Sequence, residues 1–148
     1  MKIALCADSH GNNVALDEIR KRFPNCDLYL HAGDGETSSS STFPFEMVRG
    51  NRDWDTNLPD KLLFMTPYGS LFMQHTPKIA ASFLKEQKIK IFIHGHTHAR
   101  EYFEKDGVIY INPGSISFSR DGHDLSFAVI DISQEQVKIN FYSLLDKK

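Results

Sequence analysis

Short apolar runs that end in a polar motif recur along the chain, and this pattern constrains the fold more than any other feature. Residues 2–8 form one such run and end at Asp8, and residues 27–32 and 89–94 repeat the arrangement. Each run has the length and apolar content of a buried strand. In α/β proteins, sites form where the carboxyl ends of neighbouring strands meet. The sequence therefore predicts an α/β fold with polar side chains gathered at such an edge.

Two helices and several further strands complete the expected pattern. Apolar residues at helical spacing from 14 to 23 predict one helix, with Asn12 or Asn13 as its N-cap. A second helix is expected to begin at Thr76-Pro77. Further strands are expected at residues 45–48, 62–66, 71–75, 102–104, 108–111, 127–132 and 137–142. The order is βαβ-like at first and strand-rich later, so we expect an α/β (α+β) sandwich of mixed sheets with outer helices.

Length and charge narrow the class of protein. The 148 residues correspond to one domain, so we expect a single unit over residues 1–148. A formal net charge of -2 argues against general nucleic-acid binding. The first apolar run is too short for a signal peptide, and no stretch approaches the roughly 20 apolar residues of a membrane span, so we expect a cytoplasmic protein. Cys6 and Cys26 are expected within strands, as small buried side chains.

Metal-capable side chains follow the predicted strands. They occur in four ordered motifs, which are Asp8-Ser9-His10, Gly33-Asp34, Gly50-Asn51 and Gly95-His96-Thr97-His98. His75 stands alone at the end of another predicted strand. Glycine lets the backbone turn sharply and lets a ligand approach closely. The candidate metal ligands are Asp8, His10, Asp34, Asn51, His75, His96 and His98.

The chemistry of this set predicts two divalent ions. All members offer oxygen or imidazole nitrogen, which suits Mn, Fe or Zn. The seven candidates exceed what one tetrahedral ion needs, whereas two ions that share a carboxylate would use them all. Asp34 is our choice for the shared carboxylate, because each of its oxygens can bind one ion. Each motif alone is more often structural, but their ordered combination is not expected by chance. His31 and His94 lie inside apolar runs and are expected in the core or behind the ligands.

Together these motifs resemble the ordered signature of the calcineurin-like metallophosphoesterases. The opening Asp8-Ser9-His10-Gly11-Asn12, the short chain and the motif Asn112-Pro113-Gly114-Ser115 are similar to the bacterial YfcE-like phosphodiesterase branch. The resemblance implies a two-sheet β-sandwich flanked by helices, with a dimetal site at the carboxyl ends of strands. It also implies a ligand assignment: Asp8, His10, Asp34 and His98 would hold one ion, and Asp34, Asn51, His75 and His96 the other.

The activity that this resemblance implies is metal-dependent hydrolysis of phosphoesters. We expect a phosphodiesterase in which a hydroxide activated by two ions attacks phosphorus, with Asp34, Asn51 and Arg52 as catalytic residues. Mn is the expected metal, with Fe, Zn or Ni as alternatives. The expected partners are a small phosphoester substrate and, as in related small members, further copies of the chain in a homodimer or larger homo-oligomer. Two other functions stay open: a phosphomonoesterase of the same fold, and a non-catalytic scaffold resembling the retromer subunit of this family.

Arg52 departs from the family pattern. Many relatives carry a histidine directly after the motif asparagine, where it helps to protonate the leaving group. A guanidinium stays charged, so Arg52 cannot act as a general acid, but it can bind a phosphate oxygen. The alternative is a surface arginine that pairs with Asp53 or Asp55, and the sequence leaves both interpretations open.

Other candidates for substrate contact are less specific. We expect Asn12, Asn112 and Ser115 to line the substrate pocket with Arg52, although the stretch from Asn112 to Ser115 also fits a plain structural turn. Arg120 is a weaker candidate. Trp54 either stacks on an aromatic group of the substrate or anchors its own loop.

Overall fold

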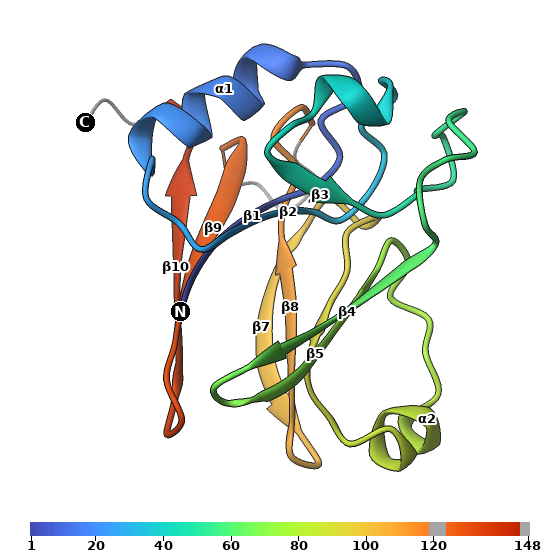
Figure 1. The fold of residues 1–148 in the computed structure, drawn as a ribbon, viewed down its shortest axis with the longest axis vertical. Helices are drawn as coiled ribbons and strands as arrows, with labels where there is room; N and C mark the ends of the chain where they lie inside the picture. Colours follow the sequence, from blue (N-terminus) through green and yellow to red (C-terminus); the bar gives the residue numbers. More distant parts are fainter. Residues whose placement is uncertain (119–123, 146–148) are drawn as a thin grey trace.

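The computed structural model describes residues 1–118 and 124–145, and this part of the chain forms two β-sheets with helices outside them (Figure 1). Within the described residues each sheet has five strands. The strand order is β10-β9-β1-β2-β3 in the first sheet and β4-β5-β6-β8-β7 in the second. Both sheets contain parallel and antiparallel pairs. The expected sandwich of two mixed sheets is therefore confirmed.

The first sheet has a parallel centre. Its strands are β1 (Lys2–Cys6), β2 (Leu28–His31), β3 (Phe45–Met47), β9 (Ser126–Ile132) and β10 (Val137–Ser143). β1 pairs in parallel with β2, and β2 with β3, whereas β9 runs antiparallel to β1. Because the three parallel strands point the same way, the segments that follow them lie at one edge of the sheet.

The second sheet repeats this arrangement. Its strands are β4 (Lys61–Thr66), β5 (Gly69–Gln74), β6 (Ile89–Ile93), β7 (Arg100–Lys105) and β8 (Val108–Pro113). β5, β6 and β8 are parallel neighbours. The Ser115 hydroxyl, which follows β8, donates a hydrogen bond of 3.0 Å to the carbonyl of Asp8, which follows β1. This bond ties the carboxyl-end edges of the two sheets together.

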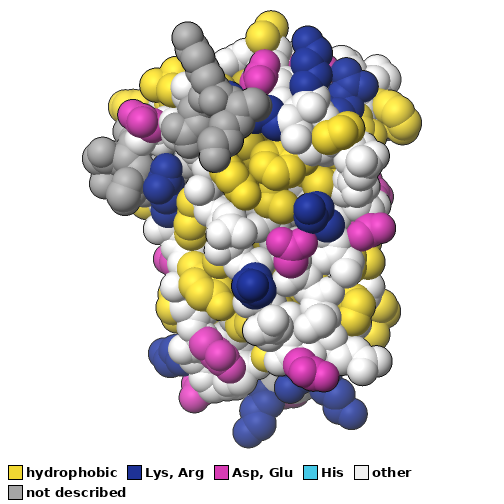
Figure 2. Space-filling view, turned by 90° about the vertical axis from the view of Figure 1, so that its left-hand side faces the viewer, with side chains coloured by type: hydrophobic (Ala, Val, Ile, Leu, Met, Phe, Trp, Pro, Cys, Tyr) yellow, Lys and Arg dark blue, Asp and Glu magenta, His cyan; other side chains and the backbone are white. Residues whose placement is uncertain are grey.

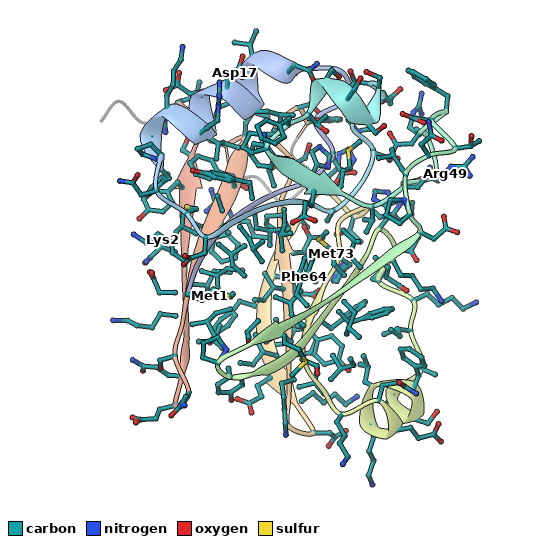
Figure 3. The ribbon with its side chains drawn as sticks, in the orientation of Figure 1. Met1, Lys2, Asp17, Arg49, Phe64 and Met73 are labelled. Carbon is teal, nitrogen blue, oxygen red and sulfur yellow. The ribbon has the colours of Figure 1, made fainter. Side chains whose placement is uncertain are left out.

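Apolar side chains that alternate along the strands hold the two sheets together. Ile3 and Leu5 of β1 point between the sheets, whereas the neighbouring Cys6 points outward to the helix layer. Figure 3 labels Phe64 and Met73, which the second sheet contributes to the same interior. Full burial of one such side chain contributes about 1.5–3 kcal/mol. The core therefore supplies the rigid support on which the polar edge is built.

One helix covers the outer face of each sheet. α1 (Asn13–Arg22) packs against the first sheet, and the Asn12 side chain caps it by accepting a hydrogen bond from the Ala15 N–H at 3.3 Å. This confirms the first expected helix and assigns Asn12 as its cap. α2 (Ala81–Glu86) packs against the second sheet through Leu84.

Two details of the secondary structure differ from the prediction. The second helix begins at Ala81 and not at Thr76-Pro77, because the Gln74 amide donates to the carbonyls of Thr76 (2.9 Å) and Lys78 (3.0 Å) and holds that segment in turns. Cys26 lies before β2 and outside any strand, half-buried, whereas Cys6 is buried in β1 as expected. Side-chain to backbone hydrogen bonds thus override the apolar pattern locally.

The surface away from the polar edge is mixed in character. The face shown in Figure 2 carries lysine, arginine, aspartate and glutamate side chains interspersed with hydrophobic ones. Among the residues described, no helix has both the length and the apolar character needed to cross a membrane. The mixed charges of this face agree with the small net charge of the chain.

Candidate metal centre

The backbone at the shared edge of the two sheets has an unusual conformation. Several non-glycine residues there have φ between 46° and 72°, in the left-handed region; they are Asp8, His10, Asp34, Glu36, His96 and His98. Such values are uncommon outside glycine, although Asp and His tolerate them better than most residues. Strained backbone of this kind clusters at functional sites. The strand-end turns therefore position these particular side chains at a cost in backbone free energy.

Two glycines make room for the ligands. A Cβ atom at Gly50 would lie 2.2 Å from Asp34 Oδ1, and one at Gly33 would lie 2.6 Å from His75 Nδ1. Any side chain at either position would displace a candidate ligand. The glycine in each motif is thus needed for close approach between backbone and ligand.

The first group of donor atoms comes from Asp8, Asp34 and His75, all buried. His75 Nδ1 donates to the Ala32 carbonyl at 2.8 Å, so Nε2 presents its lone pair in the neutral ring. Nε2 lies 3.2 Å from Asp34 Oδ2 and 3.9 Å from Asp8 Oδ1. Asp8 Oδ1 and His75 Nε2 are buried without a hydrogen-bond partner. A lone pair that faces two carboxylates in a buried position fits a bound cation.

The second group comes from Asp8, His10 and His98. His98 Nδ1 donates to the Phe118 carbonyl at 2.8 Å, and His10 Nδ1 bonds the Glu36 carboxylate. The two Nε2 atoms then face each other at 3.4 Å, and that of His98 lies 3.6 Å from Asp8 Oδ1. Two imidazole acceptors beside a carboxylate again fit a cation, with outer partners that fix each ring.

Asn51 and His96 complete the cluster. The Asn51 side-chain oxygen lies 3.2 Å from His96 Nδ1, and the His96 N–H donates to Asp8 Oδ2 at 3.2 Å. The His96 and His75 rings meet edge to face at 5.2 Å. The structure therefore brings all seven candidate ligands to one edge, four from the first sheet and three from the second.

The donor groups do not decide which carboxylate two ions would share. Among the described residues, the two donor groups have Asp8 in common, whereas we expected Asp34. Asp34 Oδ1 accepts a hydrogen bond of 2.9 Å from the Arg52 N–H, and only its other oxygen faces His75. The bridging role of Asp34 stays a prediction.

Burial controls the proton affinity of the cluster. It raises the pKa of Asp8 to about 7, while nearby His75 opposes the rise and Asp34 adds to it. Burial also acts to raise the pKa of Asp34, but the contacts with His75 and the Arg52 N–H hold that pKa below its ordinary value. For His75, burial acts to lower the pKa, yet the facing carboxylates raise it above normal. Asp8 and His75 thus both shift towards proton uptake, as expected where a site attracts positive charge.

The comparison with known protein families identifies the family of this chain. The model of the calcineurin-like phosphoesterase superfamily domain matches residues 1–135. The chain belongs to this superfamily. The probable metallophosphoesterase YsnB of Bacillus subtilis is 28% identical over 96% of this chain and 90% of its own length. The resemblance inferred from the motifs is therefore confirmed.

Solved structures share the fold of this calcineurin-like domain. A predicted phosphoesterase from Streptococcus pneumoniae superposes with a TM-score of 0.86 at 24% identity, covering 97% of this chain and 89% of that one. Yfce, a phosphoesterase from E. coli, has a TM-score of 0.70 at 18% identity, with 97% and 100% covered. Vps29 of Entamoeba histolytica, crystallised with Zn²⁺, has a TM-score of 0.76 at 21% identity, with 100% and 95% covered. At these identities the structures establish the fold.

Two acidic residues of the calcineurin-like site were missed by the sequence analysis. Glu36 contacts His10 Nδ1 and lies 3.7 Å from the Arg52 guanidinium. The Asp53 carboxylate accepts backbone N–H bonds from Asp34 (2.9 Å), Glu36 (2.8 Å) and Gly50 (2.7 Å), and so joins two strand-end loops. The sequence offers one signal for these two residues, which is their position. Glu36 lies two residues after the Gly33-Asp34 motif, and Asp53 lies two residues after the Gly50-Asn51 motif.

Arg52 lies at the mouth of the site with an exposed side chain. Its partner is Glu36, and not Asp53 or Asp55 as the alternative interpretation held. The Asp53 and Asp55 carboxylates instead accept backbone N–H groups. Arg52 is therefore oriented towards the ligand cluster by an acid that also contacts a ligand.

Three expected substrate contacts have structural roles in this arrangement. Asn112 is fully buried, and its amide donates to Gly95 and Thr97 oxygens at 3.1 and 2.9 Å. Ser115 is also buried and bonded to the Asp8 carbonyl. Asn12 is engaged in capping α1. Because Asn112 and Ser115 are buried and already paired, we replace their expected substrate contact by a positioning role, whereas Asn12 is exposed and its substrate contact stays a prediction.

Of the other residues named in the sequence analysis, the histidines lie in the interior and Trp54 lies at the surface. His31 is buried and bonds Ser9 Oγ at 2.8 Å, and burial lowers its pKa to about 4. His94 is buried and bonds Glu101 at 2.9 Å, so both histidines lie behind the ligands as expected. Trp54 is exposed. Arg120 lies outside the described residues.

Two cavities adjoin the ligand cluster and meet at Asn51, which lines both. One, of about 390 Å³, is lined by ligands together with Glu36, Arg52 and Phe118; we name it the Phe118 cavity. The other, of about 440 Å³, is lined by His75, Arg49 and Lys61 among others; we name it the Arg49 cavity. Arg49, labelled in Figure 3, is the second residue after β3. A group held at the ligands therefore has space on two sides.

Proposed function

We propose that this member of the superfamily is a metal-dependent phosphodiesterase that holds two divalent ions at the candidate centre. One ion would be held by Asp8, His10, Asp34 and His98, and the other by Asp34, Asn51, His75 and His96, with Asp34 shared between them. When bound, two such ions polarise the phosphoryl group and activate a water molecule. The oxygen and imidazole ligands suit Mn, Fe or Zn. Mn is the proposed metal, with Fe, Zn or Ni as alternatives.

The observation that carries the preference for diesters is the pair of cavities that meet at Asn51. A phosphorus atom at the ligands of a diester carries two ester groups, and each cavity can accept one of them. A monoester carries one ester group and would use only one cavity. The shape of the site therefore supports a diester substrate better than a monoester.

Arg52 supports the same preference through charge. Its guanidinium, oriented by Glu36, lines the Phe118 cavity and can bind a non-bridging phosphate oxygen. Such a contact stabilises negative charge that develops in the transition state. Arg52 supplies no proton to the departing oxygen. Substrates with acidic leaving groups are thus expected to react best.

The test compares diester and monoester hydrolysis. The Mn-loaded protein is expected to show a higher kcat/KM on bis(4-nitrophenyl) phosphate than on 4-nitrophenyl phosphate, and a steep fall as the leaving-group pKa rises. Arg52→His is expected to recover part of the loss on alkyl leaving groups, because general acid catalysis contributes about 10²–10⁴-fold. Arg20→His on the exposed face of α1 is the matched control. Equal rates on both ester classes would rule out the diesterase proposal.

A non-catalytic binding module is the second candidate, because Vps29 shares the fold. The retained ligand cluster favours the enzyme. Stoichiometric metal binding without hydrolysis of any ester would favour the module. A cytoplasmic location and a homodimer or larger homo-oligomer remain part of the proposal, and sedimentation analysis tests the second.

A further inference from the structure

An aromatic ring forms part of the wall of the ligand-containing cavity. Phe118 lines the Phe118 cavity together with Arg52 and His98, and 54% of its surface is exposed. Most large apolar side chains of the sheets are buried in one of the core clusters. An exposed phenyl ring beside charged and imidazole groups is therefore a feature of the cavity and not of the core.

Backbone contacts fix the position of this ring. The Phe118 N–H donates to Ser115 Oγ at 2.9 Å, and the Phe118 carbonyl accepts from His98 Nδ1 at 2.8 Å. The ring also meets the His98 ring edge to face, with centroids 6.0 Å apart and an interplanar angle of 82°. Phe118 is thus attached to a candidate ligand, and its apolar face is preorganised at the cavity.

The other exposed aromatic residue near the motifs does not share this position. Trp54 is 63% exposed, and we expected it to stack on substrate or anchor its loop. The residues that line the two named cavities, all within the described part of the chain, do not include Trp54. Of these two exposed aromatic side chains, Phe118 therefore lies at a named cavity and Trp54 does not.

We propose that Phe118 forms a subsite for a planar aromatic group carried by one ester arm of the substrate. The inference rests on the proposed function and narrows its substrate class. Arg52 and the ligands occupy the same cavity, so a phosphoryl group held there places its ester arm along the wall that Phe118 forms. Nucleobases and aryl groups both present a face to an aromatic side chain.

Equilibrium binding of product-like ligands to the Mn-loaded protein tests the subsite. Calorimetry compares phenyl phosphate with methyl phosphate, and AMP with ribose 5-phosphate. Removal of the aromatic group is expected to weaken binding by roughly 5–150-fold, the range for one stacked ring. If AMP binds more tightly than ribose 5-phosphate but the phenyl pair shows no difference, the subsite holds a base that a sugar separates from the phosphate. If only phenyl phosphate binds more tightly than its partner, the subsite holds a ring attached directly to the phosphate.

Phe118→Leu is the decisive variant, because its hydrogen bonds are made by the backbone and persist. It is expected to abolish the preference, because it weakens the binding of phenyl phosphate and AMP more than that of methyl phosphate and ribose 5-phosphate. Phe118→Tyr should keep the preference, and so should the control Trp54→Leu. Equal binding within both pairs by the wild type, or an undiminished preference in Phe118→Leu, would overturn the subsite alone. A folded, Mn-loaded protein that binds none of the four phosphates and hydrolyses no ester would overturn the proposed function as well.

Discussion

The two sheets contribute different chemistry to the same centre. The loops after the parallel strands β1, β2 and β3 supply both carboxylates and the amide, whereas those after β5 and β6 supply three of the four imidazoles. The first-sheet loops are tied by backbone N–H bonds to Asp53. On the second-sheet side, His75 and His98 are each aligned through a carbonyl. Neither sheet alone holds a complete donor group, so metal binding depends on how the sheets pack.

The largest expected effect tests the ligands of each sheet. Asp34→Asn and His75→Ala should each lower kcat/KM by more than about 100-fold, since loss of an outer partner alone costs about 10–100-fold. Asp34→Asn should reduce the binding of both ions, and His75→Ala that of one, as measured by elemental analysis. Circular dichroism checks that the fold is kept. Near wild-type activity of either variant at saturating metal would refute the ligand assignment.

The next effect concerns the charge of Asp8 in the metal-free protein. Its pKa is about 7 in the folded state against an ordinary 3.8, so between these values the folded state retains a proton that the unfolded state has lost. The contribution of Asp8 to the free energy of unfolding must then fall as the pH rises from 4 to 7 and stay low above 7. Asp8→Asn lacks this titration and should be more stable than wild type at pH 8, by at most about 4 kcal/mol.

Denaturant titrations of the chelated proteins at pH 4 and pH 8 measure this difference. The advantage of Asp8→Asn should vanish at pH 4, where the wild-type carboxyl is protonated. With saturating Mn the order should reverse, because the variant loses a ligand to both donor groups. If Asp8→Asn were more stable than wild type by the same amount at both pH values, the difference would come from packing and not from the charge of Asp8.

Glu36 tests whether the first-sheet loops also orient ligands. Glu36→Gln keeps the size of the side chain but weakens its contacts with His10 and Arg52. Metal affinity is expected to fall by about 10–100-fold, the usual cost of losing an outer partner. Glu46→Gln on an exposed position of β3 is the matched control. Calorimetric Mn affinities that are equal for the two variants would exclude a role for Glu36.

The sequence predicted those parts of the centre that are local in the chain. A strand followed by glycine and a metal-capable side chain is contained within a few residues, so the seven candidate ligands that lie at one edge could be picked out from the motifs, and the resemblance carried by these motifs implied the two-sheet fold. Glu36 and Asp53 act between loops that are far apart in sequence. Glu36 meets His10 only when β1 and β2 pair, and Asp53 meets the loop after β2 only when β2 and β3 pair, and no local pattern indicates either pairing.

Burial explains the remaining differences. Asn112 and Ser115 are polar and follow a strand, which is typical of pocket residues, yet both are buried and bonded internally. The start of α2 depended on the Gln74 side chain, whose bonds to nearby carbonyls compete with the helix. Side-chain direction decides these cases, and apolar periodicity does not encode it.

The smallest expected effect is that of a change at Asn112, which tests whether this residue of the second sheet positions the site or contacts the substrate. Asn112→Ala removes one of the donors to the Gly95 carbonyl and a donor to the exposed Thr97 hydroxyl, and it leaves the buried Gly114 N–H without its acceptor. Unpaired buried groups cost about 1–3 kcal/mol, so the free energy of unfolding should fall by that amount. Asn140→Ala, at an exposed position of β10, should change stability much less.

Because Asn112 does not reach the cavity surface, KM for a diester should stay near the wild-type value while kcat falls with the displaced Gly95 loop. A raised KM with unchanged stability would restore Asn112 to the substrate pocket and would make the two sheets equal partners in binding the ester.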